Sequence, residues 1–394
     1  MRRDLRGRIP PLPILRGGGI LILTALICFI AGGSFRSMHR PDPVFPSEGL
    51  SELRKLSAWF PPLKGTPADT DVYLFEGSEP GGRMLILGGS HPNEPAGFIA
   101  AVLIVENLRV RKGRIFLVPQ GNLSGFSHND PFEGSPQRFP IQTGKGARWF
   151  RYGSRLTNPV HQWPDPALYL NPGGQKLAGA DSRNLNRNYP GRRKGGLTEK
   201  TAFAVMEMIR GESIGLGVDL HEAAPEYPVI NAVVFHETGD ELAAITVMDL
   251  QMEDLDLRLE ESPKTLRGLS HREWGDSADV AAFLFETANA SHGRLKGRPS
   301  VDLILKGKDP NYVKAARLGR LFVPFDEAGI SLETRVARHL ASIRSLISAW
   351  NDLHPDQEII YSGLPDPSAV REQGIGRFLH PPRQQKREPG KKPG

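Results

Sequence analysis

The segment 85–97 constrains the fold more than any other part of the chain. An apolar run ends in two glycines, and a histidine and a glutamate, His91 and Glu94, then follow three residues apart. Apolar residues resume at once in the segment 98–105. This pattern predicts a buried strand, a tight turn and the first turn of a helix. Two such side chains at one strand end can converge on a metal ion.

The ligand types at this turn indicate a catalytic metal site. Imidazole and carboxylate ligands with a coordination position left open are typical of catalytic zinc. The one cysteine of the chain, Cys28, lies in an apolar N-terminal run, so a cysteine-held metal in the rest of the chain is excluded. Any zinc must therefore be held by histidine and carboxylate, and a third ligand and a base are needed.

Two further apolar runs end in residues of these types. The segment 214–222 ends in Asp-Leu-His, and a histidine at a strand end, His221, suits a metal ligand. Asp219 lies two residues earlier on the same strand face and could hold a ring nitrogen of a nearby histidine. The run 280–285 ends in Glu286. Partial burial there would raise the pKa of this carboxyl toward the range useful to a general base.

A fourth motif concentrates amide and guanidinium groups in one turn. The segment 181–191 contains Arg183, Asn184, Asn186 and Arg187. Arginine binds a carboxylate through paired hydrogen bonds, and neighbouring asparagine side chains can complete the cradle. The segment therefore predicts a site for a substrate carboxylate.

The remaining pattern predicts an α/β domain with a largely covered sheet. Strands are expected at 72–75, 84–87, 115–118, 217–220, 229–235 and 281–285. Helical periodicity appears at 97–107, 201–209, 240–257 and 332–353. The segment 126–180 is long and poor in periodicity, and we expect it either to bind substrate or to pack on itself.

The two ends of the chain differ from the body. Residues 1–16 are basic, and residues 17–34 form a short apolar segment of the kind found in secretory signals and membrane anchors. We interpret 35–66 as a linker, 67–353 as the folded domain and 354–394 as a flexible basic tail. The segment 17–34 therefore predicts an extracytoplasmic protein, either secreted or periplasmic after cleavage, or anchored to the membrane if uncleaved.

Charge is confined to the ends. The chain carries a net charge of +6, but residues 1–16 and 383–394 each contribute +4, which leaves the body at −2. A nearly neutral body argues against a nucleic-acid partner. The sequence does not indicate an oligomeric state.

Taken in order, the four motifs resemble those of the zinc carboxypeptidase superfamily, and more closely its succinylglutamate desuccinylase/aspartoacylase branch. The resemblance covers residues 70–350 and implies a mixed central sheet with helices on both faces. It implies one Zn²⁺ per chain, with a catalytic acid/base, a substrate cradle and an oxyanion-stabilising arginine beside it. The implied metal ligands are His91, Glu94 and His221, and the implied acid/base is Glu286. The implied substrate cradle is the pair Asn186 and Arg187, and the implied oxyanion-stabilising arginine is Arg183.

The chain also departs from the branch. Pro92 follows the first histidine where the branch has glycine, and Asn184 stands where the branch prefers aspartate. Arg183 lies closer to Arg187 than the second arginine of the branch does. Three other arginines could therefore supply the oxyanion role: Arg148, Arg151 and Arg155.

The sequence predicts a zinc-dependent hydrolase of amide bonds and leaves three alternatives open. The first is a metallocarboxypeptidase that acts on a peptide C-terminus, with cell-wall peptide as one candidate substrate. The second is a deacylase of N-acyl amino acids or similar small amides. The third is a binding module without catalysis. Neighbouring Glu222, His236 and His271 are interpreted as structural or solvated residues.

Overall fold

The computed structural model describes residues 11–130 and 133–382. The chain divides into two compact units, Met1–Pro41 and Asp42–Gly394. The predictions made for residues 1–10 and 383–394 lie outside the described residues.

Within its described residues, from residue 11 on, the first unit forms one long helix, α1 (Pro11–Met38). Its part Arg16–Met38 is long and apolar enough to cross a membrane, with a mean hydropathy of 2.1. Secretory signals near an N-terminus have the same length and composition. The apolar segment predicted at 17–34 is therefore helical, and the helix extends beyond it at both ends.

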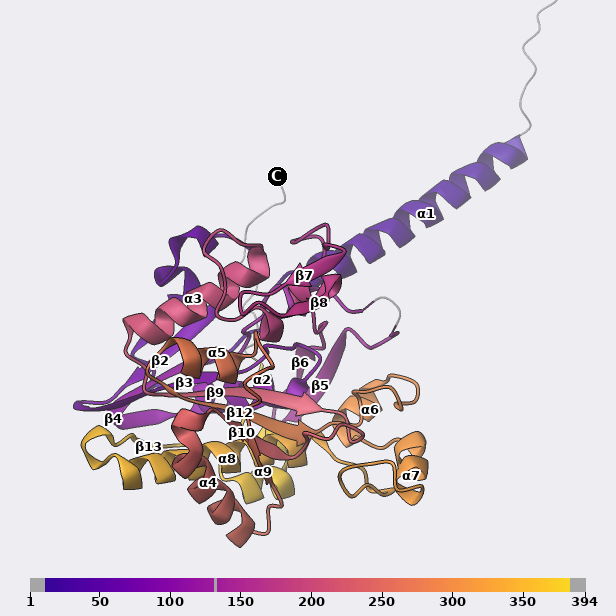
Figure 1. Cartoon of the computed structure of the whole chain (residues 1–394). Coiled ribbons are helices and arrows are strands. Elements are labelled where there is room, and N and C mark those ends of the chain that lie inside the picture. The colour runs from indigo at the N-terminus through magenta and orange to yellow at the C-terminus, as the bar shows by residue number, and fades with distance from the viewer. Residues whose placement is uncertain (1–10, 131–132, 383–394) are drawn as a thin grey trace, which may run out of the picture. The chain divides into compact units, whose positions relative to one another are not determined.

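A mixed sheet forms the centre of the second unit (Figure 1). Among the described residues it has nine strands, in the order β1-β2-β4-β3-β9-β12-β10-β11, with β13 paired to β4. The strands are β1 (Glu52–Lys55), β2 (Asp71–Glu76), β3 (Glu79–Leu87), β4 (Arg109–Val118), β9 (Leu216–Ala223), β10 (Ala232–Phe235), β11 (Arg258–Glu261), β12 (Ala281–Ala288) and β13 (Ile360–Ser362). All six predicted strands are confirmed within this sheet.

The central strands β4, β3, β9 and β12 are mutually parallel. Their carboxyl ends therefore meet at one edge of the sheet, where ligands of α/β proteins commonly bind. Leu87 pairs with Asp219, and Glu286 pairs with His221. Because paired residues point to the same face, the side chains of Glu286 and His221 lie on one face at this edge.

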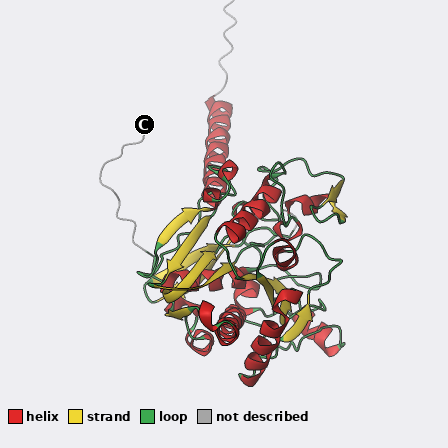
Figure 2. Cartoon of the chain, turned by 60° about the vertical axis from the view of Figure 1, so that its left-hand side comes forward, coloured by secondary structure: helices red, strands yellow, loops and turns green. Residues whose placement is uncertain are grey.

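Helices cover both faces of the sheet, as Figures 1 and 2 show. One face packs on α2 (Pro95–Asn107), α4 (Asp240–Met252) and α8 (Leu332–Leu353). The other packs on α3 (Leu197–Gly211) and α5 (Ser270–Ser277). The predicted α/β fold with a mixed, doubly covered sheet is confirmed. Helix α4 ends five residues before its predicted end because Asp254 adopts a left-handed backbone, with φ 58°.

Short elements that the periodicity does not reveal complete the unit. They include two hairpins within 126–180, built from β5 (Arg138–Thr143) with β6 (Gly146–Arg151) and from β7 (Leu168–Leu170) with β8 (Lys176–Ala178). They also include the helices α6 (Val301–Lys306), α7 (Pro310–Arg317) and α9 (Pro367–Gln373). The first hairpin packs its Phe139 and Phe150 near Phe98 of α2.

Two predicted boundaries are wrong. Much of the supposed linker 35–66 belongs to the body, because β1 pairs with β2 and Leu56, Phe60 and Leu63 are buried in the core. The supposed flexible tail is ordered from residue 354 to residue 382. There β13 extends the sheet, and apolar side chains such as Val370 of α9 join the core beside α8.

Gly97 determines how closely the start of α2 packs against the sheet. A Cβ atom on Gly97 would lie 2.4 Å from the carbonyl oxygen of Leu220 in β9. Only a glycine lets the helix start this close to the strand that carries His221.

We expect Gly97→Ala to destabilise the protein by about 1–3 kcal/mol, because the added methyl overpacks this contact. Chemical denaturation measures the change. Gly211→Ala is the matched control, since its Cβ would lie 3.7 Å from the nearest atom of Trp59 and a helical alanine is favoured by about 0.5–1 kcal/mol. An equal effect of both substitutions would contradict the assigned role of Gly97.

Candidate metal centre

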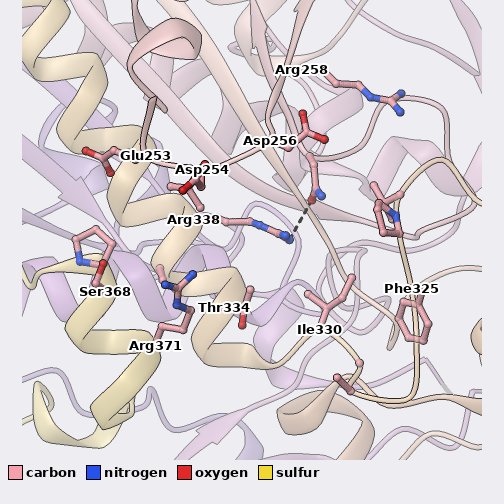
Figure 3. Close-up of a pocket in the computed structure, with 18 of the residues that line it drawn as sticks. Glu253, Asp254, Asp256, Arg258, Phe325, Ile330, Thr334, Arg338, Ser368 and Arg371 are labelled. Atoms are coloured by element: carbon pink, nitrogen blue, oxygen red, sulfur yellow. Dashed lines mark hydrogen bonds between the residues drawn. The ribbon is translucent and has the colours of Figure 1, made fainter. Parts of the chain in front are cut away.

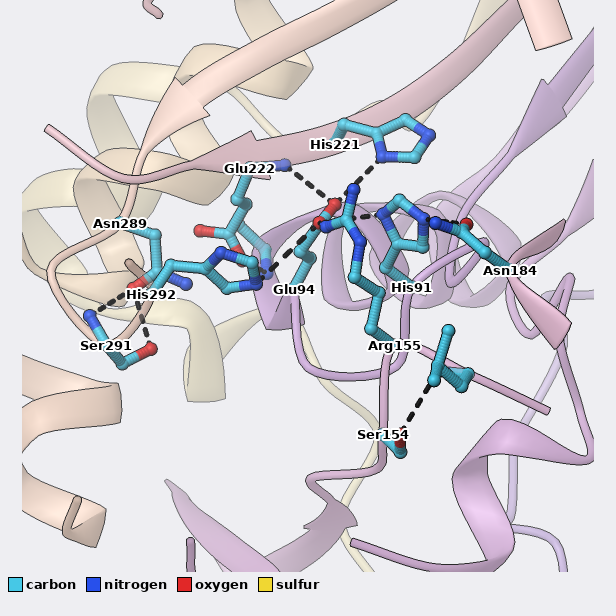
Figure 4. Close-up of polar contacts among 12 residues, drawn as sticks. His91, Glu94, Ser154, Arg155, Asn184, His221, Glu222, Asn289, Ser291 and His292 are labelled. Atoms are coloured by element: carbon cyan, nitrogen blue, oxygen red, sulfur yellow. Dashed lines mark hydrogen bonds and ion pairs between the residues drawn. The ribbon is translucent and has the colours of Figure 1, made fainter. Parts of the chain in front are cut away.

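Three of the predicted residues converge in a buried cluster. His91 and Glu94 lie in the turn between β3 and α2, and His221 lies near the end of β9. One ligand atom from each residue lies within 4.8 Å of the others. Figure 4 shows His91 and His221 on the same side of the Glu94 carboxylate. The positions that sequence spacing indicates are thus brought together.

The hydrogen bonds of His91 orient its ring. Its Nε2 lies 2.8 Å from Oδ1 of Asn184, and its Nδ1 lies 2.7 Å from Oε1 of Glu94. The same Oδ1 accepts from the backbone N–H of Asn186, which fixes the asparagine as an acceptor. Nε2 of His91 therefore donates to Asn184, and the Nδ1 lone pair is directed toward Glu94.

His221 is held in the same way by an acid. Its Nδ1 lies 2.9 Å from Oε2 of Glu94, and its Nε2 lies 2.9 Å from Oδ2 of Asp219. Asp219 in turn accepts a hydrogen bond from the hydroxyl of Ser90 at 2.9 Å. The prediction that Asp219 holds a nearby histidine is confirmed.

Burial and neighbouring charges compete in setting the pKa values of the cluster. Burial alone would raise the pKa of Glu94, but the two histidines hold it well below its usual range. Burial alone would lower the pKa of His221, but Asp219 and Glu94 raise it well above its usual range. Burial, helped by the charge of Arg155, lowers the pKa of His91 to about 3.

This donor set fits a divalent metal ion. Two imidazole nitrogens and a carboxylate, each turned toward a common point, are the ligand types of catalytic zinc. The second nitrogen of each histidine lies close to a side-chain oxygen, 2.8 Å from Asn184 for His91 and 2.9 Å from Asp219 for His221, as is usual for metal-binding histidines. Asn184 fills this supporting position beside His91, which gives a physical role to the residue that departs from the branch.

Glu286 lies beside the cluster on β12, next to His221 in the register. Burial, and to a lesser extent the charge of Glu94, raises the pKa of its carboxyl to about 8. Its Oε2 is buried and has no hydrogen-bond partner among the described residues. A carboxyl with these properties can exchange a proton near neutral pH.

Arg187 of the predicted substrate cradle is close enough to Glu94 and Glu286 for their charges to affect its pKa. Burial lowers the pKa of Arg187, the charge of Arg155 lowers it further, and Glu286 and Glu94 act in the opposite sense. Nη1 of Arg187 donates to the backbone carbonyl of Asn186 at 2.6 Å. The side-chain oxygen of Asn186 accepts from the backbone N–H of Ser270 at 2.7 Å, so it anchors α5.

The candidate oxyanion arginines differ in the residues that they contact. Arg183 forms a two-point ion pair with Asp165, at 2.6 and 2.8 Å, and donates to the carbonyl of Thr157. Its contacts do not include the metal cluster. Arg155, delivered by the long segment 126–180, places Nη1 2.8 Å from Oε1 of Glu94.

The other two candidate arginines of that segment, Arg148 and Arg151, have structural contacts. Arg148 binds the buried carboxylate of Glu106 at 2.7 Å. The backbone N–H of Arg151 donates to Asp42 at 2.7 Å, and their side chains lie 3.7 Å apart. Both contacts fasten the first hairpin to the body.

Sequence reasoning missed two residues around Glu94. Nε2 of His292, in the loop after β12, lies 3.8 Å from Oε1 of Glu94, and burial lowers the pKa of this histidine to about 4. No spacing signal marks His292, since it follows Glu286 outside any periodic segment. Arg335 of α8 is the other: it forms a fully buried ion pair with Glu222 at 2.6 Å.

A second group of possible ligands, His236, Glu237 and Asp276, is an ion-pair network. Arg272 binds both Glu237 and Asp276 at 2.7 and 2.6 Å, and Arg267 binds Asp276 as well. Two guanidinium groups already balance the carboxylates, so a metal ion has no role there. The interpretation of His236 as structural agrees with these contacts.

The Glu222–Arg335 pair is linked by hydrogen bonds to Glu94 and to the start of α2. The backbone N–H of Glu222 donates to Oε2 of Glu94, and its side chain accepts from the N–H of Ala96 at the start of α2. We expect Arg335→Met to cost about 3–5 kcal/mol, because it leaves a buried carboxylate unpaired.

Thermal and chemical denaturation measure this loss. The double variant Glu222→Gln/Arg335→Met removes both charges and keeps an acceptor for Ala96, so it should recover much of the stability. A single variant within about 1 kcal/mol of the parent would show that the pair is not needed.

Comparisons with known proteins give structural matches alone. No protein-family model and no curated protein sequence matches the chain. Cell shape determinant protein Csd4 from Helicobacter pylori is similar at 15% identity and a TM-score of 0.43, over 77% of this chain and 59% of that one. An mDAP-bound form of it, described as a D,L-carboxypeptidase, has 15% identity and a TM-score of 0.40, over 74% and 55%.

A third structure is succinylglutamate desuccinylase/aspartoacylase from Rhodobacter sphaeroides. It has 16% identity and a TM-score of 0.36, over 58% of this chain and 54% of that one. The chain thus spans less than two thirds of the length of each of these structures. The structure from Rhodobacter sphaeroides carries the name of the branch whose motifs the sequence resembles.

Proposed function

We propose that the protein is a zinc-dependent hydrolase of amide bonds, with one Zn²⁺ per chain bound by His91, Glu94 and His221. The convergence of two oriented imidazoles on one buried carboxylate carries this proposal. A carboxyl of raised pKa beside the cluster supports catalysis over binding alone.

Each group of the site has a separate task in this proposal. Bound zinc supplies a Lewis acid that activates water and polarises the substrate carbonyl. Glu286 accepts the proton of the attacking water and later delivers it to the leaving amine. Arg155 stabilises the negative charge that develops on the carbonyl oxygen, a role that the sequence gives to Arg183. The ion pair of Arg183 with Asp165 favours this reassignment.

The substrate carries a carboxylate in this proposal. Arg187, with Asn186 beside it, binds that carboxylate and places the scissile amide at the metal. A peptide C-terminus meets this requirement, so a metallocarboxypeptidase is the leading activity, and cell-wall peptide is a candidate substrate. An N-acyl amino acid meets it as well and is the alternative.

The proposed location of the protein rests on the apolar helix α1. We propose that this helix directs export, so that the hydrolase works outside the cytoplasm, either released or held at the membrane. A membrane contact through α1 applies if the segment is retained.

We expect Glu286→Gln to lower kcat by a factor of about 10²–10⁴, because the amide cannot transfer the proton. Metal content should be unchanged, since Glu286 is outside the ligand set. The assay follows product release from peptides by mass spectrometry. A variant with nearly normal turnover would contradict the assigned role of Glu286.

Arg155→Met and Arg183→Met separate the two oxyanion candidates. We expect Arg155→Met to lower kcat by about 10²–10³, the loss typical of one oxyanion donor. Arg183→Met should lower stability and leave kcat per folded molecule nearly unchanged. Steady-state kinetics with a folded-fraction correction measure both. The reverse pattern would return the role to Arg183.

Arg187→Ala tests carboxylate recognition within a substrate panel. Defined muropeptides and N-acyl amino acids are digested side by side, together with their C-terminal amides. We expect KM for the carboxylate forms to rise by about 10- to 100-fold, and the amides to change little. A fall in kcat at constant KM would mean that Arg187 acts on the transition state. If the protein turns over neither substrate class, the binding module without catalysis is the alternative that remains.

A further inference from the structure

A cavity of about 820 Å³ lies apart from the metal centre (Figure 3). Its walls come from the end of α4, the loop before β11, the segment 322–330, and helices α8 and α9. None of the residues that line it belongs to the metal cluster or to the proposed substrate cradle. The volume is in the range of pockets that bind small molecules.

One side of the cavity is basic. Arg338 of α8 is partly buried and donates one hydrogen bond, to Oδ1 of Asn231 at 3.2 Å. Arg371 of α9 lies near it (Figure 3), and Thr334 adds a hydroxyl. Among the described residues, no carboxylate forms an ion pair with Arg338 or Arg371. These two guanidinium groups therefore have capacity to bind an anion.

The lining also contains acidic residues. Asp254 and Asp256 lie in the loop between α4 and β11, and no described residue forms an ion pair with either. Glu253 and Arg344, which also line the cavity, form an ion pair with each other. Burial lowers the pKa of Arg338 to about 10, and the charge of Asp256 acts in the opposite sense.

A third part of the lining is apolar and consists of side chains from the segment 322–330. Figure 3 shows Ile330 and Phe325 to the right of Thr334, and Phe322 and Val323 also belong to the lining. A ligand that matches this lining carries an anionic group, a cationic group and an apolar branch.

We propose that the cavity binds a zwitterionic ligand of the amino-acid type, with its carboxylate on Arg338 and Arg371 and its ammonium at Asp254 and Asp256. An apolar side chain of the ligand packs on Phe325. This site is independent of the proposed hydrolysis, because its residues have no part in that reaction.

Titration calorimetry with the full chain tests the site, with phenylalanine as the probe. Phenylalaninamide lacks the carboxylate and N-acetylphenylalanine lacks the ammonium. We expect phenylalanine to bind, and each analogue to bind about tenfold more weakly or worse, because each loses one charged hydrogen-bonding end.

Variants locate the binding. Arg338→Gln and Asp256→Asn should each weaken phenylalanine binding by about tenfold or more. Arg320→Gln, an exposed arginine outside the lining, is the matched control and should bind normally. Because Asp256 is exposed, its variant reports on the site even if Arg338→Gln does not fold.

Three results would overturn the proposal. The first is the absence of phenylalanine binding at millimolar concentrations. The second is equal binding of phenylalanine and both analogues. The third is binding that survives in Asp256→Asn and Arg338→Gln but disappears in Arg187→Ala, which would place the ligand at the metal centre.

Discussion

The buried carboxylate of Glu94 is the constraint on which the site depends. An ionised group in the interior is costly unless charges and hydrogen bonds surround it. Glu94 has such partners on several sides: Nδ1 of His221, the backbone N–H of Glu222, and the guanidinium of Arg155. Arg155 and the adjacent residues His221 and Glu222 are distant from Glu94 in the sequence, so the fold must bring them together before this carboxylate can be buried.

The sheet and α2 meet that requirement. Parallel pairing of β3, β9 and β12 brings their carboxyl ends to one edge, and Gly97 lets α2 begin close to β9. Behind the cluster, the Glu222–Arg335 pair ties β9 to α8. Supporting contacts at Asn184 and Asp219 then orient the two imidazoles. The geometry of the site is thus set by backbone pairing first and by side-chain contacts second.

The sequence predicted the parts of the fold that carry a long, regular apolar pattern. The helix expected at 332–353 coincides with α8, and the strand ends that carry His221 and Glu286 are in place. Short elements such as α6 and the hairpins lack enough repeats to show a period. The linker prediction failed because buried side chains such as Phe60 are interspersed with prolines.

The convergence of His91, Glu94 and His221 was predictable because strand ends confine the possible partners. The contact of Arg155 with Glu94 was not, since Arg155 lies in a loop whose path no local pattern determines. Arg155 reaches Glu94 through the segment 126–180, whereas Arg183, nearer to the recognised motif, is held by Asp165.

Metal content of the purified full chain tests the central claim most directly. The protein is prepared without added metal or chelator and analysed by mass spectrometry for metals, beside His221→Ala. The account predicts close to one zinc per chain and its loss in the variant. A folded protein that holds no metal and takes up none on reconstitution would contradict it.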